Sequence, residues 1–143
     1  MCYALILSTT SNEDLSRSNC GEIKFNADIP ERLPAQRLNH PNKWYVGSRT
    51  GCSCSFRHLY GPEFDFRVPE DWFPEDKADI EATLMFVRVV RDLLAKGESV
   101  DCIDAWESTL AESPRPMTVD LGQIRDEEFR LFENHHFEFV GNG

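Results

Sequence analysis

The densest group of chemically capable side chains lies between residues 44 and 59. An aromatic, β-branched run opens this stretch and predicts a strand, and a loop bracketed by two glycines follows. Beyond the loop come two cysteines, an arginine and a histidine: Cys52, Cys54, Arg57 and His58. If residues 52–59 form a second strand, Cys52, Cys54 and His58 share one of its faces, because side chains alternate along a strand. If the protein has a catalytic or binding surface, we therefore expect it here.

Cys52 and Cys54 are candidate ligands for zinc, which thiolates bind well. His58 is a poor third ligand, because four residues of extended strand separate it from Cys54 by roughly 13 Å. His135 is a better one, since it shares a strand face with aromatic residues whereas His136 points the other way. The sequence contains no second Cys-x-Cys or Cys-x-x-Cys pair, and burial as a small apolar residue is the alternative for each cysteine.

Two other kinds of thiol chemistry remain open. The Cys52–Cys54 pair could act as a redox dithiol, since Arg49 and Arg57 would favour the thiolate, although the usual redox spacing is Cys-x-x-Cys. Removal of the initiator methionine would make Cys2 the first residue, and its α-amine could then act as a base for its own thiol. The sequence names no other catalytic residue, so whether the protein is an enzyme stays open.

Charge is distributed unevenly along the chain. The formal net charge is −10, and residues 98–143 contribute −8 of it through eleven acidic residues and three arginines. A nucleic-acid-binding surface needs clustered lysine or arginine to replace counterions on phosphate, and no basic stripe is present. We therefore expect no nucleic-acid partner and interpret the acidic half as a solvated surface.

Cysteine usage and hydropathy bear on location. Five cysteines among 143 residues are too few for a disulfide scaffold and odd in number, which favours reduced thiols inside the cell. No apolar run approaches the ~18 residues of a membrane helix. The short apolar run after Met1 has no basic segment before it, unlike a secretory signal. We predict a cytoplasmic protein that does not enter the membrane.

One long amphipathic helix is predicted over about residues 74–96. Pro74 suits a first helical turn, and Gly97 suits a stop. Apolar residues recur at helical spacing, and we expect three of them to be nearly inaccessible: Leu84, Val87 and Leu94. The same pattern predicts that three polar residues stay in water: Glu81, Arg88 and Asp92.

The fold class follows from adding the expected strands, at 2–9, 44–46, 52–59, 99–106 and 132–140. The helix needs a sheet of several strands to cover its wide apolar face. We predict one α+β domain over residues 1–143, in which a mixed or antiparallel sheet carries the 74–96 helix on one face.

For function, the sequence favours a non-enzymatic binding or interaction module that uses a protein or small-molecule partner. Three aromatic side chains in or beside loops could provide its contact surface: Trp44, Tyr60 and Trp72. The alternative is a zinc-binding or thiol-redox protein that uses Cys52 and Cys54, and the lesser alternative is nucleophilic chemistry at Cys2.

Overall fold

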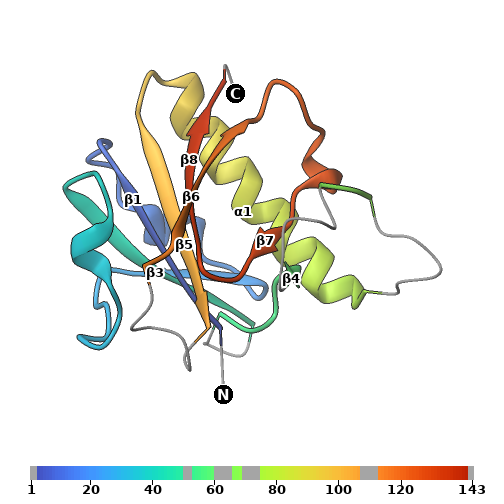
Figure 1. Cartoon of the computed structure of the whole chain (residues 1–143), viewed down its shortest axis with the longest axis horizontal. Coiled ribbons are helices and arrows are strands. Elements are labelled where there is room, and N and C mark those ends of the chain that lie inside the picture. The colour runs from blue at the N-terminus through green and yellow to red at the C-terminus, as the bar shows by residue number, and fades with distance from the viewer. Residues whose placement is uncertain (1–2, 50–52, 60–65, 69–74, 107–112, 142–143) are drawn as a thin grey trace.

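The computed structural model describes residues 3–49, 53–59, 66–68, 75–106 and 113–141. In these ranges a six-stranded sheet carries one long helix, α1, along one face (Figure 1). The strand order is β2 (Ile23–Asn26), β3 (Asn42–Ser48), β1 (Tyr3–Thr9), β5 (Val100–Trp106), β8 (His135–Val140), β6 (Arg115–Asp120). Neighbours are antiparallel except β6 and β8, which run parallel. The predicted α+β class, with a mixed sheet and a helix on one face, is confirmed.

Helix α1 spans Lys77–Ala95, a few residues shorter than predicted. Asp76 caps its first turn, because the Asp76 carboxylate accepts a 3.0 Å hydrogen bond from the backbone N–H of Ala78. Gly97 has φ +84°, a left-handed conformation that glycine adopts without strain, and the helix ends just before it. Pro74, the predicted first residue, lies outside the described residues.

The buried face of α1 is rotated from the predicted one. Val87 is buried and Arg88 and Asp92 are exposed, as expected, but Leu84 and Leu94 are only half-buried and so is Glu81. The residues that face the sheet are Ala82, Thr83, Phe86, Val87, Val90 and Leu93. Phe86, the largest of them, is fully inaccessible and sets the orientation of the helix.

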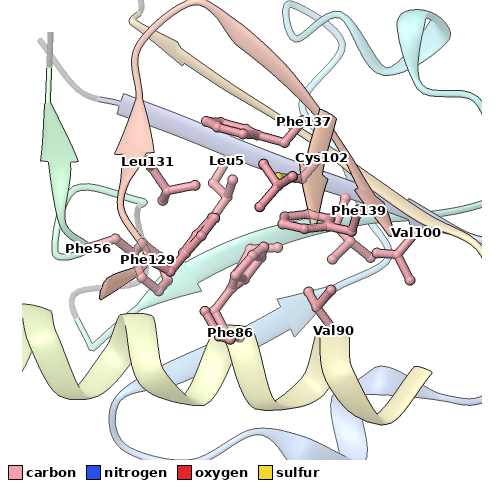
Figure 2. Close-up of a cluster of buried hydrophobic side chains, with 14 of the residues drawn as sticks. Leu5, Phe56, Phe86, Val90, Val100, Cys102, Phe129, Leu131, Phe137 and Phe139 are labelled. Carbon is pink, nitrogen blue, oxygen red and sulfur yellow. The ribbon is translucent and has the colours of Figure 1, made fainter. Parts of the chain in front are cut away.

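Aromatic rings fill the space between α1 and the sheet. Figure 2 shows Phe86 pointing from the helix into this layer, where its ring centroid lies 6.2–6.4 Å from those of Phe56, Phe129 and Phe139. A buried side chain of this size contributes about 1.5–3 kcal/mol through removal of apolar surface from water. The wide aromatic layer is therefore the main reason why the helix lies across this face.

The other face of the sheet is covered by a loop, residues 27–41, which contains the short 3₁₀ helix η2 (Ala35–Arg37). Leu33 and Leu38 of this loop pack on apolar side chains of β1 and β5. In Figure 1 the loop, drawn in cyan, lies on the side away from α1. It covers β1, β3 and β5, and the outward side chains of β6 and β8 stay exposed apart from the half-buried His136.

The two edges of the sheet are protected differently. At the β2 edge the side chain of Asn19 pairs with both backbone groups of Phe25, since its Oδ1 accepts from the Phe25 N–H at 2.6 Å and its Nδ2 donates to the carbonyl at 3.4 Å. At the β6 edge, the N–H of Arg115 donates to Asn134 O. Backbone groups alternate in direction along a strand, so the nitrogen of the next residue, Pro116, faces the open edge and not β8. Pro116 has no N–H to offer an added strand, which blunts that edge.

The predicted strand at 52–59 is wrong over most of its described length. Residues 53–56 form a turn, and only His58–Leu59 (β4) is extended, paired in parallel with β7 (Leu131–Phe132) outside the main sheet. The turn is held by the Ser53 hydroxyl, which donates to Val46 O at 2.6 Å and accepts from Leu5 N at 2.9 Å. These bonds fold the segment back over the sheet. No helix in the described ranges is both long and apolar enough to cross a bilayer.

Candidate functional site

Strand β5 carries two aspartates, and each binds a histidine on a different face of the sheet. Asp101 and Asp104 are three residues apart, so their side chains leave the strand in opposite directions. Asp104 lies on the α1 side and binds His58, whereas Asp101 lies on the loop side and binds His136. Both aspartates are fully inaccessible to solvent. Buried ionisable pairs are rare and often functional, so both pairs are candidate functional sites.

In the first pair both ring nitrogens of His58 are occupied. Nδ1 lies 2.8 Å from Asp104 Oδ2, and Nε2 lies 2.5 Å from the backbone oxygen of Ser53. A carbonyl oxygen only accepts, so Nε2 must carry a proton and donate it. The bond between Nδ1 and Asp104 then contains one further proton, held by the imidazole or by the carboxyl group.

The surroundings of Asp104 disfavour its negative charge. Burial raises the pKa of this carboxyl group, and the neighbouring His58 offsets only part of the rise. Its Oδ1 has no hydrogen-bond partner among the described residues. An inaccessible carboxyl group with one unpartnered oxygen is costly to ionise.

Tyr3 covers the first pair. Its ring stacks on that of His58, with centroids 3.9 Å apart and planes inclined by 2°. The Tyr3 hydroxyl is hydrogen-bonded to Glu133, and its pKa is raised by burial and then by the negative charges of Glu133, Asp104 and Cys54. The phenol therefore stays protonated, and the stack separates His58 from solvent.

Two of the three predicted metal ligands lie around this group. Cys54, in the 53–56 turn, is half-buried and close enough to Tyr3 to affect its pKa. His135 is buried opposite Asp104 on β8, and its Nδ1 lies 2.8 Å from the backbone oxygen of Glu133. Cys52 lies outside the described residues. In the part of the chain that the structure describes, no group of three or more His, Cys, Asp or Glu side chains is placed to hold a metal ion.

The remaining thiols have separate positions. Cys102 is buried in the core between α1 and the sheet, where burial raises its pKa well above the ordinary value. Cys20 is exposed, and its sulfur lies 3.4 Å from that of Met85. Cys20, Cys54 and Cys102 are not disulfide-bonded. Cys2, the candidate N-terminal nucleophile, lies outside the described residues.

Arg57, a candidate for activating a thiol, uses its guanidinium to bind a carboxylate and backbone oxygens. Its side chain is 1% exposed and makes a two-point ion pair with Glu75, at 2.6 and 2.9 Å. The other donors bind the backbone oxygens of Arg67, Glu127 and Phe129. All five N–H donors are thus used, and the guanidinium ties the segments around residues 57, 67 and 75 to the distant 127–129 segment.

The second pair has a different pattern. His136 Nε2 lies 2.5 Å from Asp101 Oδ2, the same oxygen accepts from Asn39 N at 2.9 Å, and the Ser8 hydroxyl donates to Oδ1. Burial alone would raise the pKa of Asp101, but these three donors outweigh it and lower the pKa. Asp101 lies between the serine and the histidine, and Ser8 is inaccessible, so this is not the arrangement of a catalytic triad.

Beside the second pair lies the part of the sheet that we call the outer face. It consists of the side chains of β6 and β8 that point away from α1: Pro116, Thr118, Asp120, His136, Glu138 and Val140. A cleft of about 230 Å³ adjoins it, lined by Asn39, His40, Ser99, Val100, Glu138, Phe139 and Val140. The alternation along 135–140 predicted which residues face outward, but not that the covering loop would end at β5.

A second cleft, of about 240 Å³, lies between α1 and the 3₁₀ helix η1 (Leu15–Ser18). It is lined by both signs of charge, and Lys96 and Glu13 on its rim form an exposed ion pair at 2.6 Å. The outer face, by contrast, carries two acids and no lysine or arginine.

The predicted aromatic contact surface is only partly described. Trp44 is half-buried against the core, and its Nε1 is buried without a hydrogen-bond partner among the described residues. Packing therefore uses much of this ring, which weakens the case for Trp44 as a contact residue. Tyr60 and Trp72 lie outside the described residues.

Searches with protein-family models, among curated proteins and among solved structures found no match to this chain.

Proposed function

We propose that the protein is a non-enzymatic binding module. The observation that carries the proposal is the state of the His58–Asp104 pair, in which both imidazole nitrogens are bound to fixed internal partners. A general base needs a nitrogen within reach of the proton that it removes. In His58, Nδ1 is held by Asp104 and Nε2 by a backbone carbonyl. Tyr3 covers the face of the ring.

The second His–Asp pair supports the same proposal. Ser8 and His136 both bind Asp101 and are not paired with each other, and Ser8 is inaccessible. Together with His40, whose N–H donates to the Ser8 hydroxyl at 3.1 Å, this network fixes the 27–41 loop to the sheet. Satisfied polar networks of this kind rigidify a fold, and a rigid surface suits binding.

The test is a selection of ligands followed by a check for turnover. A random peptide library is displayed against the immobilised protein, and the enriched peptide is titrated by calorimetry and then analysed by mass spectrometry. Saturable one-to-one binding with the peptide recovered unchanged is the expected result. A covalently altered peptide, or no enrichment above a heat-unfolded control, would contradict the proposal.

A second candidate is the zinc or thiol-redox function at Cys52 and Cys54 in the cytoplasm. Its support is the position of Cys54, which is half-buried beside the Tyr3–His58 stack. Elemental analysis of protein purified without chelator should then find one equivalent of zinc, lost in the C52S/C54S double variant. If zinc is absent and alkylation shows ordinary thiol pKa values near ~8.5, this candidate is wrong.

A further inference from the structure

The outer face is acidic, and its two carboxylates accept hydrogen bonds from uncharged donors, Gly122 N and Asn39 Nδ2. Two of its six residues, Asp120 and Glu138, are exposed acids, and none is lysine or arginine. Its histidine, His136, is already bound to Asp101. The face also belongs to the 98–143 segment, which carries most of the net negative charge. Such a surface attracts a cationic partner by electrostatic complementarity.

An apolar side chain lies among these acids. Val140 is 44% exposed and is the large hydrophobic residue that the described ranges leave most open to water. Lysine and arginine side chains combine an aliphatic stem with a charged end, so one side chain can contact both Val140 and Glu138. The outer face therefore suits basic residues better than a purely polar ligand.

The adjoining cleft limits the size of what can enter. Glu138 and Val140 both line it, together with the turn at Asn39 and His40. Its volume of about 230 Å³ is below the ~300–1,000 Å³ of typical small-molecule sites, so it suits one or two side chains of a larger partner. Glu138 Oε1 accepts from Asn39 Nδ2 at 2.9 Å, and both residues line the cleft.

The edge of the sheet at β6 bears on how a partner segment would bind. A peptide that added a strand to β6 would miss a hydrogen bond at Pro116, which has no N–H to donate. A segment that lies across the face has no such loss. An extended segment also presents alternate side chains to one surface, and these could meet Val140 and the two acids.

We infer that the outer face docks an extended, arginine- or lysine-containing segment of a partner protein, with a basic side chain in the Asn39–Val140 cleft. The inference rests on the proposed binding function and names the partner class. The site is distinct from the Tyr3–His58 group, which lies toward the other end of β5.

The test uses two blocked peptides of equal length, Ac-Arg-Val-Arg-Val-Arg-NH₂ and Ac-Gln-Val-Gln-Val-Gln-NH₂. Each is titrated into ¹⁵N-labelled protein at physiological salt and followed by amide chemical shifts. The arginine peptide should shift amides of β6, β8 and residues 39–40 saturably, and the glutamine peptide should bind several-fold more weakly. Shifts centred elsewhere, or no saturable binding of the arginine peptide, would overturn the inference.

A matched pair of variants separates a site from general attraction. The D120N/E138Q variant removes two charges from the outer face, and E81Q/D92N removes two from α1 on the opposite side of the sheet. Only the first should weaken the arginine peptide, by about three- to tenfold. Equal weakening in both would show non-specific attraction and overturn the inference. A peptide selected from the display library that binds outside the outer face would also overturn it, while leaving the binding function intact.

Discussion

Strand β5 places one aspartate on each face of the sheet, and the two carboxyl groups have pKa values displaced in opposite directions. Both are inaccessible and both bind a histidine. Asp101 accepts hydrogen bonds from Ser8, Asn39 and His136, and its pKa is lowered. Asp104 has His58 alone and an unpartnered oxygen among the described residues, and its pKa is raised. Asp104 is the more deeply buried of the two and has fewer donors, and both differences favour the charged form of Asp101 over that of Asp104.

The largest effect is expected for Asp101→Asn. The amide that replaces the carboxylate keeps one acceptor oxygen, while its NH₂ group meets donors from Ser8, Asn39 or His136. Loss of charge-assisted bonds in a buried site should lower the free energy of unfolding by about 2–4 kcal/mol. Urea unfolding at pH 7 measures it, and a loss below about 1 kcal/mol would mean that the donor count does not explain the stability of this site.

Asp101 should also affect how the free energy of unfolding changes at acidic pH. Because the folded-state pKa of Asp101 is lowered, its stabilising contribution is present above the unfolded value, near ~3.9, and is lost as pH falls through the folded value. The difference in unfolding free energy between wild type and Asp101→Asn should therefore shrink between pH 5 and pH 3. A difference that stays constant over this range would contradict the lowered pKa.

Asp104→Asn should cost less, below about 1.5 kcal/mol at pH 7. The asparagine NH₂ can donate to Nδ1 of a neutral His58, which still donates to Ser53 through Nε2, and no carboxylate has to be buried. The pH dependence should have the opposite sign from that of Asp101. Because the folded-state pKa of Asp104 is raised, the stability of the wild type falls as pH rises from the unfolded-state pKa through the folded-state pKa. The stability of Asp104→Asn relative to wild type should therefore increase over the same pH range.

Chemical unfolding of both variants at several pH values tests this contrast. If the Asp104→Asn and Asp101→Asn differences change with pH in the same direction, the two sites are not electrostatically opposite. His58 and His136 serve as internal reporters, because their ring resonances should move only in the variant that affects their own aspartate.

Strand alternation and helical spacing were enough to predict the fold class from the sequence. They also placed His135 and His136 on opposite faces, as the structure has them. Helical spacing did not predict the buried face of α1, because apolar residues surround most of the helix. Only the packing of Phe86 among the other rings selects the buried side. Spacing alone could not distinguish Leu84 from Phe86.

The two His–Asp pairs escaped the sequence reasoning for a different reason. Asp101, Asp104 and His58 are common residue types, and the chain has many acidic side chains. What pairs them is the long-range fold of the chain, which brings together residues 46 positions apart in one pair and 35 positions apart in the other, beyond any local pattern. Alternation wrongly predicts a strand over 52–59, because the hydrogen bonds of Ser53 to Val46 and to the distant Leu5 fold this segment back.

The smallest effect that distinguishes the two sites is at Tyr3, which stacks on His58 beside Asp104. Burial raises the pKa of the Tyr3 phenol, and the charges of Glu133 and Asp104 add to the rise. In wild type, one of the three tyrosines should therefore fail to ionise near the ordinary ~10 when absorbance at 295 nm is followed against pH. Asp104→Asn removes one of the charges, so the late tyrosine should ionise at lower pH in that variant. In Asp101→Asn its ionisation should occur at the same pH as in wild type. A Tyr3→Phe variant identifies the transition, because its loss there assigns the late phenol to Tyr3. If the transition moves equally in both aspartate variants, the change reflects general loosening of the fold, and the charge on Asp104 is not what Tyr3 detects.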